Sequence, residues 1–263
     1  MTSSRLPAYA LQFDLTGRVV VITGAARGLG QHFAYACSAA GAQVVVADKL
    51  LTEARATAAE IVENGGLAQA AEVDISCEKS VAELACWCAD KFSNRIHGLV
   101  NNAALATGIG GKRYDQIEPD QWDLVMKINV KGPWLMVRAF EKLLSESGSG
   151  RIVNIASDTA LWGAPWIMHY VSSKGAVLAM TRALSRELGD SNITVNAIAP
   201  GLTLVPATEY VSAQRHQEYI DGRAIRRSQM PGDVAGTAVF LLSDAAKFVT
   251  GQTLAVNGGF VLN

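Results

Sequence analysis

The sequence predicts a single α/β domain in which parallel strands alternate with helices. Short β-branched runs recur along the chain, and amphipathic segments of about 10–15 residues separate them, as in consecutive βαβ units. Near the N-terminus a strand, a glycine-rich turn and a helix follow one another directly. No internal repeat or interdomain linker interrupts the pattern, so we expect a short lead-in over residues 1–14 and a single domain over residues 15–263.

Composition fits a globular cytoplasmic protein. The chain has 263 residues, of which 49% are apolar and 18% charged, enough to bury a substantial core. Its formal net charge of −1 gives no reason to expect nucleic acid or a membrane surface as partner. No apolar run approaches the roughly 18–20 residues of a membrane span, and no secretory signal is recognisable. The four cysteines lack the spacing of a zinc site, so no metal is expected.

The first predicted strand, residues 18–23, leads directly into a glycine-rich turn. Gly24, Gly28 and Gly30 lie in this turn, and a helical pattern follows it. Glycines let the backbone approach a pyrophosphate, and the helix N-terminus offers free N–H groups and a positive dipole end. We therefore interpret residues 24–30 as a dinucleotide-binding loop, with Arg27 and Leu29 also among the cofactor-binding residues.

The second predicted strand ends in Asp48, eighteen residues after Gly30. A carboxylate at this position can bond the ribose hydroxyls of an adenosine, and it would repel a 2′-phosphate. Arg27 would instead favour a cofactor with a 2′-phosphate, because a guanidinium pairs with phosphate. Asp48 is expected to lie closer to the ribose, so the sequence favours NAD over NADP. Capping of the next helix by Asp48 is compatible with this role.

The alternation continues with helices over about 52–64 and 78–93 and two further strands. A glycine-rich loop then precedes a long helix over about 119–145 that carries Asn129. Asparagine is a poor choice in a helix interior for propensity alone. Asn129 either bonds locally or points into a site, and the sequence leaves both possibilities open.

Residues 157–174 carry the strongest chemical signal. Tyr170 and Lys174 are four residues apart where a helical pattern begins, so both side chains leave the same helix face. A neighbouring ammonium favours the phenolate, so the pair can accept a proton near neutral pH. Ser157 follows an apolar strand, which places its hydroxyl where open α/β sheets bind their ligands. There it can hold a substrate oxygen on which charge develops.

The last part of the chain contains a strand over 193–199, a helix over about 232–243 and a strand over 253–256. Residues 202–230 show no clear strand, and so long a connection is usually functional. We interpret 202–230 as a lid over the substrate.

Several aromatic residues lie close to the predicted centre. Trp162 and Trp166 lie between Ser157 and Tyr170, and Tyr210 lies in the predicted lid. Large side chains there favour an apolar or aromatic substrate pocket formed by Trp162, Trp166 and Tyr210 together with Ser157 and Tyr170. Packing of one or both tryptophans in the core or at a subunit interface is an equally weighted alternative. His169 leaves the helix about 100° from Tyr170, so it is interpreted as a structural or interface histidine rather than a catalytic one.

Taken together, these motifs resemble the short-chain dehydrogenase/reductase family from about Leu15 to the end of the chain. The matching residues are Thr23-Gly-Ala-Ala-Arg-Gly-Leu-Gly30, Asp74, Asn101-Asn-Ala103, Asn129, Ser157, Tyr170, Lys174 and Pro200-Gly201. The resemblance implies a Rossmann-like, doubly wound fold with about seven parallel strands. It also implies assembly as a tetramer or dimer, and we expect a homotetramer.

The resemblance assigns a role to each catalytic position. It implies that Tyr170 is the general acid/base on the alcohol or carbonyl oxygen and that Ser157 steadies this oxygen. Lys174 would lower the pKa of Tyr170 and bond the nicotinamide ribose. Asn129 would hold a water in a proton relay through Lys174.

The resemblance also places residues around the cofactor. Asp74, with Ile75, would contact the adenine, Asn101 and Ala103 would flank the cofactor, and Pro200-Gly201 would approach the nicotinamide. Two positions depart from the family pattern. Ala104 replaces a common glycine, and Val205 replaces a common threonine, which leaves Thr203 as the candidate for the carboxamide contact.

The sequence thus predicts NAD-dependent oxidation of a secondary alcohol, which is cyclic, sugar-like or aryl, to its ketone. The nearest alternative, suggested by Arg27, is an NADPH-dependent reductase of 3-oxoacyl thioesters or other ketones. A dinucleotide-binding regulator without catalysis is the third possibility, and the intact set of Ser157, Tyr170 and Lys174 disfavours it.

Overall fold

The structure is a computed structural model that describes residues 13–262. The lead-in expected over residues 1–14 therefore falls mostly on residues 1–12, which lie outside the described part of the chain. Leu15 is already fully buried, packed against the first helix and its neighbours.

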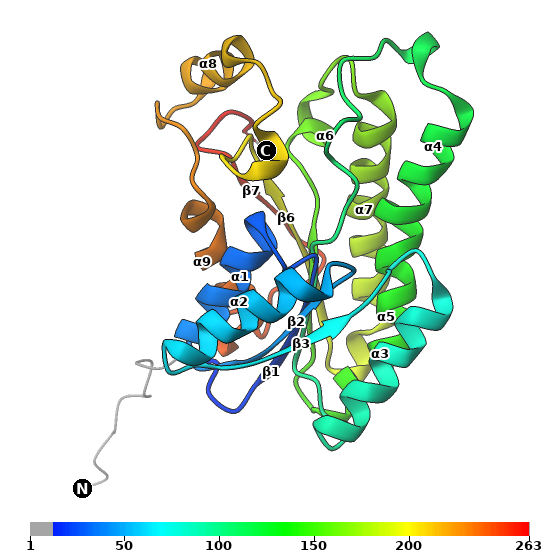
Figure 1. Ribbon diagram of the computed structural model, residues 1–263, viewed down its shortest axis with the longest axis vertical. Helices are drawn as coiled ribbons and strands as arrows, with labels where there is room; N and C mark the ends of the chain where they lie inside the picture. Colours follow the sequence, from blue (N-terminus) through cyan, green and yellow to red (C-terminus); the bar gives the residue numbers. More distant parts are fainter. Residues whose placement is uncertain (1–12, 263) are drawn as a thin grey trace, which may run out of the picture.

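Seven parallel strands form one sheet in the order β3-β2-β1-β4-β5-β6-β7 (Figure 1). The strands are β1 (Val19–Thr23), β2 (Gln43–Asp48), β3 (Leu67–Glu72), β4 (Gly98–Asn101), β5 (Arg151–Ile155), β6 (Thr194–Pro200) and β7 (Thr253–Val256). The chain moves outward from β1 to β3 and then returns to β4 on the other side of β1. Open α/β sheets bind ligands at such a switch point, beyond the carboxyl ends of the strands. The predicted doubly wound fold is confirmed.

Helices cover both faces of this sheet (Figure 1). They are α1 (Gly28–Ala39), α2 (Leu51–Glu63), α3 (Glu78–Lys91), α4 (Pro119–Met126), α5 (Gly132–Glu146), α6 (Thr159–Trp162), α7 (Met168–Glu187), α8 (Ala213–Gly222) and α9 (Pro231–Leu242). In the described part of the chain, none of them is both long and apolar enough to span a bilayer.

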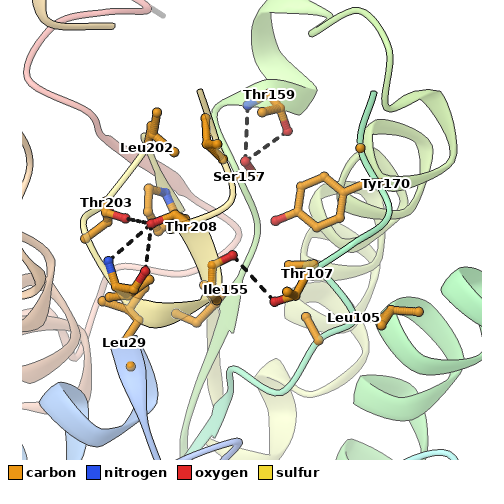
Figure 2. A pocket seen from close by; sticks show the side chains of 18 of the residues that line it. Leu29, Leu105, Thr107, Ile155, Ser157, Thr159, Tyr170, Leu202, Thr203 and Thr208 are labelled. Atoms are coloured by element: carbon orange, nitrogen blue, oxygen red, sulfur yellow. Dashed lines mark hydrogen bonds between the residues drawn. The ribbon is translucent and has the colours of Figure 1, made fainter. Parts of the chain in front are cut away.

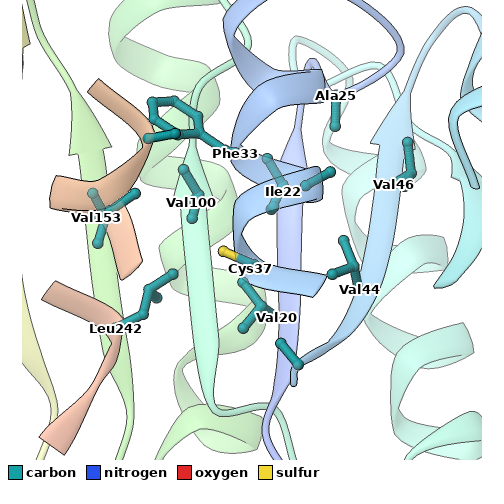
Figure 3. Packing of buried hydrophobic residues seen from close by; sticks show 14 of the residues in the cluster. Val20, Ile22, Ala25, Phe33, Cys37, Val44, Val46, Val100, Val153 and Leu242 are labelled. Carbon is teal, nitrogen blue, oxygen red and sulfur yellow. The ribbon is translucent and has the colours of Figure 1, made fainter. Parts of the chain in front are cut away.

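The alternation of side chains along β1 shows how the layers form. Val20 and Ile22 pack with Phe33 of α1 and with Leu242 of α9 on one face (Figure 3). Val19 and Val21 point to the other face, where α3 and α5 pack. Burying each of these side chains stabilises the fold by about 1.5–3 kcal/mol. Two apolar layers therefore hold the sheet rigid and present its carboxyl edge to the site.

Two predicted segments differ in detail from the structure. The helix expected over 119–145 contains a π-helical turn, Lys127–Lys131, between α4 and α5, and Asn129 lies in it. Such turns occur frequently at functional sites. The predicted lid, residues 202–230, has no regular strand, as expected, and contains α8, a helix that the sequence did not specify. The remaining helices and strands agree with the prediction to within about two residues.

Candidate active site

A cavity of about 1010 Å³ opens at the carboxyl edge of the sheet. It is lined by the glycine loop, by the loops after β4, β5 and β6, and by the first half of α7 and α8. Its volume matches the upper end of the range typical of ligand and cofactor sites. Within it lie most of the residues that the sequence predicted to bind cofactor or to catalyse.

The glycine loop, residues 24–30, forms a backbone cradle at the cavity, and two of its glycines lie too close to neighbouring atoms to carry a side chain. A Cβ atom on Gly30 would lie 2.2 Å from the carbonyl oxygen of Gly24 and 2.4 Å from Nδ2 of Asn102. Gly24 has a φ of +65°, and a Cβ there would lie 2.7 Å from Cα of Ala103. Arg27 and Leu29 line the cavity beside these glycines. The glycines thus let the loop pack closely against residues 102–103, and the loop brings the start of α1 to the cavity wall, which fits a bound pyrophosphate.

Two carboxylates lie beyond the glycine loop in the cavity wall. Asp48 is buried, and its two oxygens accept hydrogen bonds from the N–H groups of Ala26 and Leu50, each at 3.0 Å. The carboxylate of Asp74 accepts a hydrogen bond from the backbone N–H of Ser76 at 2.8 Å. Hydrogen bonding to Ser76 lowers the pKa of Asp74, and the positive charges of Lys127 and Lys49 act in the same direction. Both acids are thus held in place by the backbone, as contacts to an adenosine require.

Asn101, which the sequence predicted to flank the cofactor, does not line the cavity, whereas the next residue does. The side chain of Asn101 is buried in the sheet, where its amide donates to Oδ1 of Asn154 at 2.9 Å, and it does not line the cavity. Its neighbour Asn102 lines the cavity instead, and its amide donates to the carbonyls of Thr23 and Gly24. Successive side chains of a strand point to opposite sides, so only one of the two can face the ligand. Ala103 and Ala104 line the cavity as expected, and so does Ile75.

Ser157, Tyr170 and Lys174 come together in this cavity. Figure 2 shows the hydroxyl of Tyr170 directed into the cavity on the side of Ser157. The hydroxyl of Ser157 accepts hydrogen bonds from Oγ1 of Thr159 at 2.9 Å and from its N–H at 3.3 Å. Neither bond uses the proton of Ser157, which can be donated to the hydroxyl of Tyr170 or to a substrate oxygen in the cavity.

The ionisation of this pair differs from the expectation. Burial raises the pKa of Tyr170 to about 12, with smaller contributions from Tyr210 and Asp158 in the same direction and an opposing hydrogen bond from Ser157. Burial lowers the pKa of Lys174 to about 8, and its Nζ donates to the carbonyl of Ile155 at 2.7 Å. Nζ lies 5.7 Å from the centroid of the Tyr170 ring. Desolvation of the Tyr170 phenol therefore outweighs the lowering of its pKa that was expected from Lys174.

The question left open for Asn129 is answered by its contacts. Its Oδ1 accepts from the N–H of Leu105 at 2.7 Å, and its Nδ2 donates to the carbonyl of the same residue and to Oγ of Ser173. Ser173 in turn donates to the carbonyl of Tyr170 at 2.7 Å. Asn129 thus ties the loop after β4 to the turn of α7 that carries Tyr170.

The loop after β6 completes the cofactor end of the cavity. Pro200, Gly201, Thr203 and Val205 all line it. The hydroxyl of Thr203 donates to the carbonyl of Gly201 at 3.0 Å, which fixes the turn. The hydroxyl of Thr208 lies within 2.7 Å of the Thr203 carbonyl, and Figure 2 shows the two threonines side by side.

The predicted aromatic substrate residues separate into two groups. Trp166 and Tyr210 line the cavity, and the Tyr210 hydroxyl donates to the carbonyl of Ala106 at 2.9 Å. Trp162 does not line it, so its assignment as a substrate residue is wrong. Its ring packs 5.7 Å from Phe260 and 6.4 Å from Tyr219, centroid to centroid. Trp162 is thus half-buried against other aromatic side chains, which agrees with the alternative that it packs within the protein rather than against substrate.

A buried polar cluster beside Ser157 was missed by sequence reasoning. Asp158 is fully buried, and its Oδ1 accepts from the hydroxyl of Tyr219 in α8 at 3.2 Å. Burial raises the pKa of Asp158 to about 6, and the positive charge of Arg223 opposes this shift. Tyr219 stacks on Phe260 at 4.3 Å. Nothing in the spacing of these residues indicates that they meet, because more than sixty positions separate Asp158 from Tyr219.

A cavity that joins a backbone cradle for a dinucleotide to a tyrosine placed for proton transfer is what a nicotinamide-dependent oxidoreductase requires. A family model described as enoyl-(acyl carrier protein) reductase matches residues 24–261. The chain is 38% identical to a 3-oxoacyl-[acyl-carrier-protein] reductase of Synechocystis sp. over 250 residues, which cover 94% of this chain and 98% of the relative.

Solved structures agree with these relatives. A 7α-hydroxysteroid dehydrogenase complexed with NADH and 7-oxo glycochenodeoxycholic acid superposes with a TM-score of 0.89 at 33% identity, covering 96% of this chain and 98% of that one. A gluconate 5-dehydrogenase from Burkholderia cenocepacia in complex with NADP and tartrate gives a TM-score of 0.89 at 30% identity, with the same coverage. The chain belongs to the short-chain dehydrogenase/reductase family. It is an NAD(P)-dependent oxidoreductase that interconverts an alcohol and its carbonyl compound.

Proposed function

We propose that the protein is an NAD-dependent dehydrogenase that oxidises a secondary alcohol to a ketone, with Tyr170 as the proton acceptor. The observation that carries this proposal is the convergence of Ser157, Tyr170 and Lys174 in the cavity that also contains the glycine cradle. The cofactor, when bound, supplies the hydride acceptor. Every other requirement of the reaction falls on side chains and backbone groups of this chain.

Proton transfer is assigned to Tyr170. In the reduction direction its phenol is already protonated at neutral pH and gives its proton to the carbonyl oxygen. In the oxidation direction it must first lose that proton, and the ammonium of Lys174 favours this loss. The hydroxyl of Ser157 holds the reacting oxygen. Because the side chain of Asn129 is occupied by Leu105 and Ser173, we assign a relay water to its main-chain carbonyl.

The preference for NAD over NADP is assigned to Asp48. Its oxygens each accept one backbone N–H, which leaves lone pairs for the two hydroxyls of an adenosine ribose. A 2′-phosphate would place like charge beside this carboxylate, at a cost of up to about 4 kcal/mol at 4 Å and an effective dielectric of 20. Arg27 is exposed at the cavity wall and offers a compensating charge only if it moves onto the phosphate.

The test is reduction of NAD⁺ and NADP⁺ with a panel of polyols, cyclic alcohols and aryl secondary alcohols, using Tyr170→Phe as the comparison. We expect turnover with NAD⁺ that falls about 10²–10⁴-fold in the variant, the usual contribution of a positioned acid/base. Undiminished turnover by Tyr170→Phe would refute the proposed mechanism. Tight binding of NADH with no turnover of any alcohol would favour a regulatory role.

The second candidate is an NADPH-dependent reductase of 3-oxoacyl thioesters. Two observations favour it, namely Arg27 beside the glycine cradle and the resemblance to an acyl-carrier-protein reductase. Its signature would be oxidation of NADPH by an acetoacetyl thioester that is faster than any alcohol oxidation with NAD⁺.

We also propose that the protein is cytoplasmic and works as a homotetramer with a single catalytic domain, residues 15–263. Exposed apolar side chains on α4 and α5, notably Leu124 and Trp134, support association through these helices. Light scattering coupled to size-exclusion chromatography gives the subunit number directly, and a monomer would contradict the proposal.

A further inference from the structure

Two charged residues of α8, Arg215 and Glu218, line the catalytic cavity and have no part in the proposed proton transfer. The helix contributes one wall of the cavity, together with Ser212, which accepts a hydrogen bond from the N–H of Arg215. A charged group in the wall of a substrate site selects ligands by their charge. The question is therefore which ligand group this pair would recognise.

The guanidinium of Arg215 is held against two aromatic rings. Its central carbon lies 4.9 Å from the centroid of Trp162 and 5.7 Å from that of Tyr219. Nη1 donates to Oε2 of Glu218 at 2.8 Å. The side chain is only 32% exposed. Cation–π contacts with two rings and one ion pair restrict the guanidinium, so less conformational freedom remains to be lost on binding.

The support beneath Arg215 reaches the catalytic centre. Tyr219 is buried, stacks on Phe260 and donates to the carboxylate of Asp158. Asp158 directly follows Ser157, whose hydroxyl is assigned to the reacting oxygen. This chain of contacts fixes Arg215 relative to Ser157. A ligand that binds both groups therefore needs two polar groups at a set separation.

One edge of the guanidinium remains available. In residues 13–262, the hydrogen bond of Arg215 to Glu218 uses Nη1, and no bond to a side chain or carbonyl uses Nε or Nη2. A planar pair of donors matches the two oxygens of a carboxylate. Glu218 stays ionised at neutral pH, because hydrogen bonding to Arg215 lowers its pKa. Glu218 thus partly offsets the positive charge without covering the free edge.

We propose that Arg215 binds a carboxylate of the substrate, so that the enzyme acts on a hydroxy acid and forms the keto acid. This inference rests on the proposed function and names its substrate class. The alcohol carbon gives its hydride to the dinucleotide and the hydroxyl gives its proton to Tyr170, while the carboxylate is unchanged. Arg215 is a specificity-determining residue in this account, and it takes no part in proton transfer.

The test measures binding rather than turnover, by calorimetry on the intact protein saturated with its reduced dinucleotide. The probes are two matched pairs in which CH₂OH replaces each carboxylate, namely 3-hydroxybutyrate with 1,3-butanediol (one carboxylate) and tartrate with threitol (both carboxylates). We expect each acid to bind about 10–100-fold more tightly than its partner, the usual effect of a charge-assisted Arg–carboxylate contact. Arg215→Met should abolish this preference, and Arg215→Lys should retain part of it.

Two further variants sharpen the result. Glu218→Gln removes the competing anion, so the affinity for both acids should rise up to about fivefold. Arg226→Met removes an exposed arginine outside the cavity and should leave every affinity unchanged. Acids that bind no more tightly than their partners, or a preference that survives Arg215→Met, would overturn the proposal. Tighter binding of glycerol 3-phosphate than of either acid would overturn the assignment to a carboxylate.

The proposed function can be refuted independently of this inference. Tyr170→Phe should lose turnover and keep the preference for the acids, because Arg215 is intact. Turnover retained in Tyr170→Phe would refute the mechanism whatever the binding data show.

Discussion

The two ends of the catalytic cavity are built in different ways. The cofactor end consists of backbone and of residues at strand ends, such as Gly24, Gly30 and Asp48, within a short stretch of chain. The substrate end is lined by side chains of α8 and of the loops after β4, β5 and β6, and the packing of Trp162, Tyr219 and Phe260 supports it from behind. The first depends on the rigid sheet, whereas the second depends on packing between loops. Substitutions at the two ends should therefore have different effects on ligand binding and on the stability of the fold.

The largest effect is expected for Gly30→Ala at the cofactor end. The new Cβ would collide with the Gly24 carbonyl at 2.2 Å, so the cradle must shift. A displacement of this kind should weaken dinucleotide binding about 100-fold, measured by NADH fluorescence. Gly236→Ala in α9 is the matched control, since no neighbouring atom lies within 4 Å of its Cβ. Wild-type affinity in Gly30→Ala would show that the cradle is not rigid.

At the substrate end, Asp158→Asn should stabilise the protein at neutral pH. The pKa of Asp158 is raised from 3.8 to about 6, so the protonated acid favours folding below about pH 4 and this contribution is lost as the pH rises through 6. Asparagine removes the buried charge and still accepts from Tyr219. We expect a gain of up to about 3 kcal/mol in the free energy of unfolding at pH 7.5, and almost none at pH 4.

Urea unfolding at both pH values measures this gain. Asp123→Asn, at an exposed position of α4, serves as the control and should change stability by less than about 0.5 kcal/mol. A loss of stability in Asp158→Asn at pH 7.5 would mean that the ionised carboxylate is well compensated by its neighbours.

The two tryptophans provide a smaller test of the same contrast. Trp162 packs against the stacked rings of Tyr219 and Phe260, so Trp162→Ala should lower the free energy of unfolding by about 2 kcal/mol. Trp166 is 57% exposed and lines the cavity, so Trp166→Ala should cost less than about 1 kcal/mol and mainly raise KM. A larger loss of stability in Trp166→Ala, together with a larger rise of KM in Trp162→Ala, would show that Trp166 supports the fold and Trp162 contacts the substrate.

The sequence predicted the cofactor end well because its residues are neighbours in the chain. A strand, a glycine turn and an acid at the next strand end form one local pattern, and its geometry follows from the βαβ unit. The error at Asn101 has a simple cause. Two adjacent asparagines at a strand end point to opposite sides, and sequence alone does not fix which one faces the ligand.

The substrate end could not be predicted for two physical reasons. Contacts such as Asp158 with Tyr219 depend on how the chain passes through residues 202–230, and no local signal specifies that path. The pKa of Tyr170 depends on how much water the fold excludes, which the spacing of Tyr170 and Lys174 does not reveal. Trp162 illustrates the first limit, because it is near the catalytic residues in sequence but packs away from the cavity against Tyr219.

The most direct test of the central claim is a titration of the wild-type protein and Asp48→Asn with NADH and NADPH, followed by fluorescence. If Asp48 sets the cofactor preference, the wild type binds NADH more tightly, and the variant shifts the ratio toward NADPH by about tenfold or more. Tighter binding of NADPH by the wild type, with no change in Asp48→Asn, would contradict this account and make Arg27 the residue that selects the cofactor.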